Sequence, residues 1–211
     1  MNFNCTCSKP SFLNKKFSYW EDRETTYDER QIIDVLMKDD FLKNKNILHI
    51  GIGNSEVAKT LDSSNKIYGI TISNNEINYA KSLNLENYIT FFCDKYSIKL
   101  SNIFPNLKFN LIIDTNLKSY SCCQNAFDFM MKNLFNYLEP GGKIITSKKG
   151  MKWFKTLKPK LSFNYKKFFY YKMKEVSGNP NNILSENELK QICIKYRIKI
   201  LFDEKLCYLI K

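Results

Sequence analysis

Short apolar runs alternate with amphipathic segments between residues 47 and 146. The apolar runs read NILHI, KIYGI, YITFF, FNLII and KIIT. They are rich in β-branched and aromatic residues and lack strict polar alternation, which is typical of strands buried on both faces. Between them, NSEVAKTL, NNEINYAKSL and CCQNAFDFMMKNLFNYL carry apolar residues at helical spacing. This strand–helix alternation predicts a parallel, doubly wound sheet.

The segments outside this alternation predict further elements. ETTYDERQIIDVLMKDDFL has the spacing of a leading helix, and KFFYYKMKEV is typical of an extended segment. SENELKQICIKY opens with Ser185 and carries Glu188 three residues later, a capping-box arrangement. IKILFDEKLCYLIK predicts two strands around a tight turn. The whole pattern predicts an α/β fold: a doubly wound, mostly parallel seven-stranded sheet with a C-terminal antiparallel strand hairpin.

Length and composition narrow the class of protein. A chain of 211 residues favours a single domain, 1–211, and 44% hydrophobic residues indicate a folded protein. No apolar run reaches the roughly 18 residues of a membrane-spanning helix. The first ten residues, MNFNCTCSKP, lack the basic and apolar regions of a signal peptide. We therefore expect a cytoplasmic protein that does not associate with membranes.

The seven cysteines are scattered without regular spacing, and we expect them to be reduced thiols. Cys5-x-Cys7 and the adjacent Cys122 and Cys123 raise the question of a metal site. Zinc favours two well-spaced ligand pairs that are often completed by histidine. The one histidine, His49, is far from both cysteine pairs in the sequence. We expect no metal centre.

The formal net charge is +12, and a basic protein favours anionic partners. Arginine, whose planar fork favours phosphate and base recognition, occurs only at Arg23, Arg30 and Arg197. Lysine, asparagine, isoleucine, phenylalanine and tyrosine are abundant together, as in proteins from AT-rich genomes. We therefore attribute part of the charge to codon bias.

The first predicted strand ends at Gly51-Ile52-Gly53, and a helix is expected to begin at Asn54 or Ser55. Ligands of such sheets bind beyond the carboxyl ends of the strands, where the strand order reverses. Glycines there let a ligand lie against the backbone, and a helix N-terminus offers N–H groups to an anionic group. The motif alone leaves two alternatives open, a nucleotide-type ligand and an ordinary tight turn.

The order ILHIGIGNS, KIYGITIS, YITFFCDKYS, FNLIID and LFNYLEPGGKIITS resembles the class I S-adenosylmethionine-dependent methyltransferases across residues 47–211. LEPGGKIIT is the most specific part, since that family places a Leu-x-Pro-Gly-Gly turn before its fifth strand. The resemblance implies a Rossmann-like methyltransferase fold, S-adenosylmethionine as cofactor and methyl transfer as activity. A nicotinamide-binding domain is disfavoured, because Glu56 stands where that motif has its third glycine.

The resemblance places the methionine part of the cofactor on the glycine loop. The loop residues are Gly51, Ile52, Gly53, Asn54 and Ser55, and Ser55 replaces a usual third glycine. His49 stands where the family most often has an acidic residue near the cofactor's ammonium group. A neutral imidazole can accept a hydrogen bond there but supplies no negative charge. The alternative is a buried histidine that is hydrogen-bonded to backbone.

The end of the second predicted strand departs from the usual family pattern. Thr71 replaces the acid that binds the ribose hydroxyls. Cyclopropane fatty acid synthases and their relatives have a similar Gly-x-Thr-x-Ser stretch followed by glutamine, and Glu76 stands at the glutamine's position. A carboxylate can accept hydrogen bonds from both hydroxyls. We therefore expect Thr71, Ile72, Ser73 and Glu76 to contact the cofactor.

The third and fourth predicted strands each end beside an acidic residue. Asp94 matches the acid that accepts from the adenine amino group in the family, and Lys95 would flank the ring. Asp114 ends the fourth strand, nearest the transferred methyl group in this fold. We expect Asp114 to orient the acceptor or remove its proton, and Tyr120 to position it.

Residues 143–174 contain eleven lysines and no acidic residue, interleaved with aromatic residues. The family carries substrate-specific insertions after its fifth strand, so we expect 148–184 to be a basic insertion beside the substrate and 1–45 to be a cap with the leading helix. A lysine-lined lip would suit an anionic acceptor. The alternatives are a solvated face and an RNA-binding surface. The residues expected to contact the acceptor are Tyr19, Trp20, Tyr27, Lys118, Lys148, Lys149 and Lys152.

The leading hypothesis is O-methylation of a small anionic acceptor, such as a sugar, a nucleotide-linked or a phosphorylated metabolite, by in-line displacement. One alternative is a methyltransferase fold without catalysis that binds a partner, which the departures at His49, Ser55 and Thr71 motivate. Another is RNA methylation, which the basic run motivates. The sequence does not identify the acceptor, the methylated atom or the oligomeric state.

Overall fold

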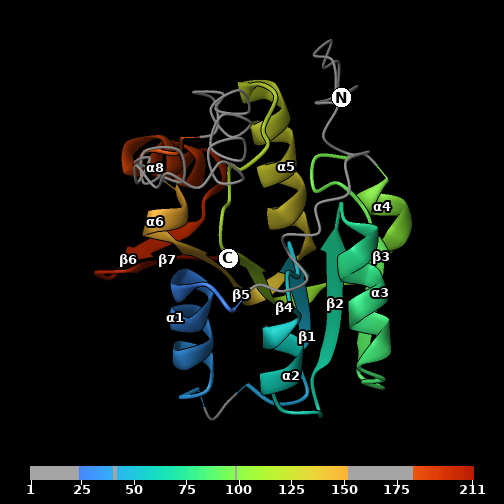
Figure 1. Cartoon of the computed structure of the whole chain (residues 1–211). Helices are drawn as coiled ribbons and strands as arrows, with labels where there is room; N and C mark the ends of the chain where they lie inside the picture. Colours follow the sequence, from blue (N-terminus) through green and yellow to red (C-terminus); the bar gives the residue numbers. More distant parts are fainter. Residues whose placement is uncertain (1–23, 40–41, 98, 152–182) are drawn as a thin grey trace, which may run out of the picture.

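The computed structural model describes residues 24–39, 42–97, 99–151 and 183–211. Its centre is a seven-stranded sheet (Figure 1). The strands are β1 (Asn46–Ile50), β2 (Lys66–Thr71), β3 (Tyr88–Phe92), β4 (Phe109–Asp114), β5 (Leu138–Ser147), β6 (Lys199–Phe202) and β7 (Leu206–Ile210). Their order is β3-β2-β1-β4-β5-β7-β6. The first five are parallel and β7 runs antiparallel to both neighbours, which confirms the predicted sheet and its hairpin.

Helices connect the strands and cover both faces of the sheet. They are α1 (Tyr27–Leu36), α2 (Glu56–Thr60), α3 (Asn74–Ser82), α4 (Leu100–Ile103), α5 (Gln124–Tyr137), α6 (Lys148–Met151) and α8 (Glu186–Tyr196). Thr26, Ser73 and Ser185 cap α1, α3 and α8 through their hydroxyl oxygens, and the Ser185 cap is the predicted one. α4 and α6, with four residues each, are too short to show a hydrophobic period.

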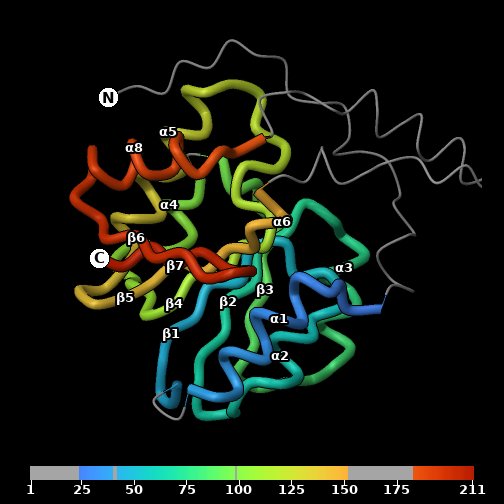
Figure 2. The backbone as a smooth tube through the Cα atoms, turned by 90° about the vertical axis from the view of Figure 1, so that its left-hand side faces the viewer, coloured from blue at the N-terminus to red at the C-terminus, as the bar shows by residue number. Residues whose placement is uncertain are grey.

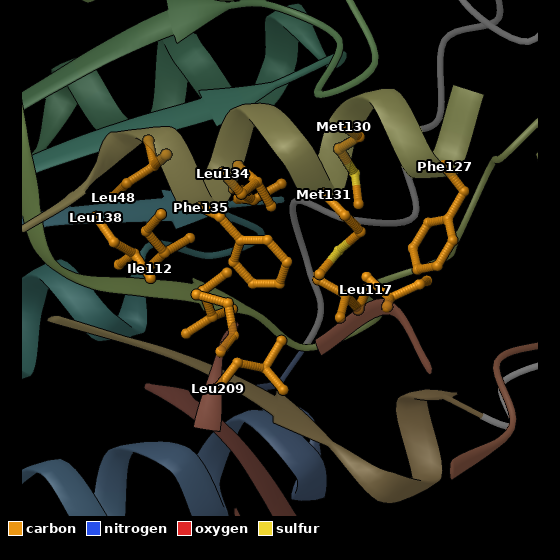
Figure 3. Packing of buried hydrophobic residues seen from close by; sticks show 14 of the residues in the cluster. Leu48, Ile112, Leu117, Phe127, Met130, Met131, Leu134, Phe135, Leu138 and Leu209 are labelled. Carbon is orange, nitrogen blue, oxygen red and sulfur yellow. The ribbon is translucent and has the colours of Figure 1, made fainter. Parts of the chain in front are cut away.

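Alternate residues of the central strands face two different layers of the core. Ile47 and Leu111 pack with residues of α1 and α2, whereas Leu48 and Ile112 pack with residues of α5 and α8. Figure 2 shows α1 and α2 on one side of the sheet and α5 and α8 on the other. Figure 3 shows the second layer, in which Leu134 of α5 lies close to Leu48 and Ile112. Burial on both faces explains why the strand sequences do not alternate.

Within the described ranges, no helix is both long enough and apolar enough to cross a membrane. The cysteines of these ranges, Cys93, Cys122, Cys123, Cys193 and Cys207, are free thiols. Cys5 and Cys7, the predicted extended segment KFFYYKMKEV, and most of the predicted cap and basic insertion lie outside the described residues. The single-domain organisation stays a prediction.

Candidate active site

The carboxyl ends of β1, β2, β3 and β4 lie along one edge of the sheet. β1 pairs with β2 on one side and with β4 on the other, so the strand order reverses there. In this register His49 lies beside Ile113, and Ile50 beside Asp114. The sheet therefore brings the predicted site residues of four separate loops to the edge at which ligands of open α/β sheets bind.

The glycine loop has a left-handed backbone at three of its residues. Gly51 has a φ of +73° and Gly53 a φ of +52°, and no heavy atom of the described residues lies within 4 Å of a Cβ built on either. Ser55 is also left-handed, with a φ of 59°. Its side chain is fully buried, and its hydroxyl lies 3.2 Å from the Tyr88 hydroxyl. The two glycines leave open space for a ligand, whereas Ser55 fastens the loop to β3.

Glu76 links the glycine loop to the end of β2. Its buried carboxylate accepts a hydrogen bond of 2.5 Å from the Thr71 hydroxyl and one of 3.3 Å from the Gly53 N–H. The Thr71 oxygen in turn accepts from the Ser73 N–H, and the Ser73 hydroxyl accepts from the Glu76 N–H. Ile72 lies between them and is partly buried. Glu76 and Thr71, which were expected to contact the ribose, thus lie directly against the glycine loop.

Lys95 lies at the centre of a network that fixes the loop after β4. Its ammonium group is 2.7 Å from the Asp114 carboxylate, and both side chains are buried. The same group donates to the carbonyl oxygens of Asn116 and Leu117, and it lies 3.3 Å from the Ser119 hydroxyl. The Lys95 side chain therefore points toward the β4 loop and forms an ion pair with Asp114.

The two residues on either side of Lys95, Asp94 and Tyr96, also make hydrogen bonds near the β4 loop. Asp94 is partly exposed, and its carboxylate accepts a hydrogen bond from the Tyr96 N–H at 3.0 Å. The Tyr96 hydroxyl donates to the Ser119 carbonyl oxygen at 2.8 Å. Burial raises the pKa of Tyr96 well above its ordinary value, so this donor keeps its proton. Asp94 thus lies just beyond the end of β3, next to the residues that hold the β4 loop.

Lys118 and Tyr120 stand further along the same loop. The Lys118 ammonium group pairs with Glu188 of α8 at 2.6 Å and donates to the Gln124 side chain at 2.9 Å. It is buried and lies 5.0 Å from the centroid of the Phe127 ring. Tyr120 has a left-handed backbone, with a φ of 60°. The loop after β4 is thus tied both to the loop after β3 and to α8.

The two described lysines that follow β5 contact different helices, Lys149 the beginning of α1 and Lys148 the beginning of α8. The Lys149 ammonium group is 3.8 Å from the Asp28 carboxylate and 5.8 Å from the centroid of the Tyr27 ring, which is 61% exposed. Lys148 pairs with Glu186 at 3.2 Å. Tyr27 and Lys149, two of the residues predicted to contact the acceptor, therefore lie next to each other. Tyr19, Trp20 and Lys152 lie outside the described residues.

Sequence reasoning missed Glu29, which lies in the first turn of α1. Its side chain is buried, and its Oε1 atom is 3.7 Å from Nε2 of His49, which is fully buried. Glu29 precedes the buried Ile32 and Ile33 by three and four residues, so it falls on the apolar face of the helix. A charged residue on that face was the available signal.

His49 does not have the backbone partner that one alternative supposed. Neither ring nitrogen makes a hydrogen bond to any of the described residues. Burial lowers the pKa of the imidazole to about 4, so the ring is neutral at pH 7. Buried polar atoms are normally hydrogen-bonded, which makes these nitrogens candidates for contact with a ligand.

No family model matches the sequence, and no curated protein matches it. Solved structures do match. The plantazolicin methyltransferase BamL, in complex with a triazolic desmethylPZN analogue and SAH, has a TM-score of 0.64 and 15% identity over 92% of this chain and 88% of its own. The magnesium protoporphyrin IX methyltransferase ChlM from Synechocystis PCC 6803, with bound SAM, has a TM-score of 0.61 and 12% identity over 95% and 93%.

A third similar structure is the N-methyltransferase NodS from Bradyrhizobium japonicum WM9, in complex with S-adenosyl-L-homocysteine. Its TM-score is 0.59, with 12% identity over 94% of this chain and 92% of that one. Identities this low show a shared fold, and the matches extend over nearly the whole of each chain. The chain therefore has the fold of the class I S-adenosylmethionine-dependent methyltransferases.

Proposed function

We propose that this protein is a methyltransferase that uses S-adenosylmethionine and a small-molecule acceptor. The observation that carries the proposal is the arrangement at the strand-order reversal: two left-handed glycines with open space above them, joined to the end of β2 by the Glu76 carboxylate. This is a cradle that a side chain would fill. Three structures of the same fold, BamL, ChlM and NodS, hold SAH or SAM.

The residues present fit the parts of the cofactor. In this proposal the loop from Gly51 to Ser55 holds the methionine end, Glu76 accepts from the ribose hydroxyls, and Asp94 accepts from the adenine amino group. When bound, the cofactor supplies a methyl group that its sulfonium already activates. The protein then has to hold an acceptor in line with that methyl group and exclude water.

The acceptor that we propose is a small molecule with an ionised oxygen, such as a phosphorylated metabolite. Lys149 follows the carboxyl end of β5, and its ammonium group lies 5.8 Å from the centroid of the exposed Tyr27 ring. An ionised oxygen needs no general base, which suits an Asp114 carboxylate that is held against Lys95 at 2.7 Å. In this proposal Asp114 and Lys95 hold the β4 loop, and Tyr120 positions the acceptor.

Two measurements test the proposal. Calorimetry of the whole chain with S-adenosylhomocysteine should give micromolar binding, and no binding would favour a partner-binding protein without catalysis. The enzyme should then be incubated with methyl-labelled S-adenosylmethionine and separate pools of phosphorylated metabolites, neutral sugars, amines and RNA. We expect label in the phosphorylated pool. Transfer to amines would reassign the methylated atom, as in the N-methyltransferase NodS, and transfer to RNA would reassign the substrate class.

A further inference from the structure

A buried carboxylate–imidazole contact joins helix α1 to strand β1 beside the glycine loop. Glu29 is 5% exposed and His49 is 0% exposed, and the closest distance between their polar atoms is 3.7 Å. His49 is two residues before Gly51, the first left-handed glycine of the loop. The pair therefore lies at the methionine end of the proposed cofactor site.

The beginning of α1 is held in this position by contacts to the glycine loop and to α6. The Asn54 side chain donates a hydrogen bond of 3.0 Å to the Thr25 hydroxyl, which ties the residues before α1 to the glycine loop. Asp28 lies 3.8 Å from Lys149, beyond the end of β5. Figure 1 shows α1 and α2 next to each other on the same face of the sheet. Glu29 is thus fixed against β1 by its helix.

The chemistry of the pair favours a cationic ligand that donates hydrogen bonds. The His49 ring is neutral at pH 7, so one of its nitrogens is an acceptor. Placing the ring hydrogen on Nε2, toward the Glu29 carboxylate, leaves Nδ1 as that acceptor. Nδ1 makes no hydrogen bond to the described residues. A carboxylate next to a hydrogen-bond acceptor attracts an ammonium group and repels an anion.

We propose that Glu29 and His49 together bind the α-ammonium group of the cofactor, with His49 accepting a hydrogen bond and Glu29 supplying the negative charge. The inference rests on the proposed function. The family that the sequence resembles places an acid on the first strand, where this chain has His49. Here the charge comes from a different element, the first turn of α1. Glu29 is accordingly a cofactor-binding residue that no strand or loop motif reveals.

Calorimetry with two ligands tests this inference. One ligand is S-adenosylhomocysteine, and the other is its deamino analogue, which keeps the carboxylate, ribose and adenine. Glu29→Gln should weaken binding of S-adenosylhomocysteine by about 10- to 100-fold, as for a lost charge-assisted hydrogen bond, and should change binding of the deamino analogue by less than about twofold. Asp34→Asn is the matched control, since Asp34 is an exposed acid of the same helix.

The outcomes separate the inference from the proposed function. Equal S-adenosylhomocysteine affinities for Glu29→Gln and Asp34→Asn would overturn the inference alone. So would an equal loss for both ligands, because it would show a general structural effect. Failure of the unaltered protein to bind S-adenosylhomocysteine would overturn the proposed function and the inference with it. If Glu29→Gln does not fold, Glu29→Asp and His49→Asn should show the same selective loss for the ligand with the amine.

Discussion

Lys95 and Asp114 form a buried ion pair, 2.7 Å apart, between the loop after β3 and the end of β4. The ammonium group also donates to two carbonyl oxygens of the β4 loop. Removing one partner of a buried ion pair is costly, because the remaining ion has lost its hydration and no longer has an opposite charge beside it. The pair is therefore a structural support of the candidate site.

Lys95→Met should destabilise the fold by about 3–5 kcal/mol, since it leaves the Asp114 carboxylate buried without its cation. Urea unfolding measures the change. Lys195→Met is the control, because the Lys195–Asp128 pair is 3.8 Å long and its lysine is 59% exposed. That variant should cost less than about 1 kcal/mol. Equal losses of unfolding free energy in the two variants would show that the buried Lys95 pair stabilises the fold no more than the exposed Lys195 pair.

Gly53→Val should abolish or strongly weaken binding of S-adenosylhomocysteine, because a side chain would occupy the open space above the loop. It should also cost about 1–2 kcal/mol of stability through the left-handed backbone. Gly141 is left-handed too, at a φ of +77° and with open space, but it lies in β5, before the pairing with β7. Gly141→Val should show the stability loss with unchanged ligand affinity. Weakened binding in both variants would argue against the proposed place of the cofactor.

Stability should fall on acidification because of His49. The unfolded chain takes up a proton on this residue below its ordinary pKa of 6.5, whereas the folded protein takes it up only near pH 4. The unfolded state therefore binds more protons between these values, and the stabilisation that is complete above pH 6.5 is lost as the pH falls toward 4. The loss should be about 3 kcal/mol.

Urea unfolding of the unaltered protein and of His49→Gln between pH 4 and 7.5 measures this loss. The difference between their free energies of unfolding should shrink or reverse as the pH falls, because the glutamine does not titrate. A pH-independent difference would show that His49 is protonated equally in both states.

Asp94→Ala should weaken binding of methylthioadenosine, which has adenine and ribose but no amino acid, by about 1–3 kcal/mol. The carboxylate of Asp94, a partly exposed residue, is the proposed acceptor for the adenine amino group. Asp62→Ala is the control, since Asp62 is an exposed acid just before β2. Calorimetric affinities that match for the two variants would remove Asp94 from the site.

Replacing Lys148, Lys149 and Lys152 together with alanine should raise the acceptor KM about tenfold, because three positive charges that would attract an anionic acceptor are lost, while leaving cofactor affinity unchanged. Steady-state kinetics with the acceptor from the labelling screen measures this. The control is the triple alanine variant at Lys59, Lys66 and Lys132, which removes the same charge elsewhere. A similar rise in both variants would show a net-charge effect without a local contact.

The pattern of apolar positions predicted the sheet, because the buried strands are short continuous apolar runs and the connecting helices carry apolar residues at helical spacing. It did not predict the direction of individual polar side chains. Lys95 was expected beside the adenine because it follows Asp94, whereas its ammonium group reaches residues 114–119. The sequence pattern did not predict Glu29 as a site residue, because its contact with His49 joins helix α1 to strand β1. Such contacts depend on tertiary packing, which a local pattern does not contain.

The place of β7 between β5 and β6 has a consequence for the order of folding events. Among the described strands, β6 pairs only with β7, so the two strands join the sheet as one unit. Their own pairing closes a short turn and is fast, whereas β5 and β7 pair residues as distant as Ile145 and Tyr208. We expect the hairpin to form early and its docking on β5 to be the slow step, so substitutions on the β5–β7 boundary should change the refolding rate more than substitutions within the turn.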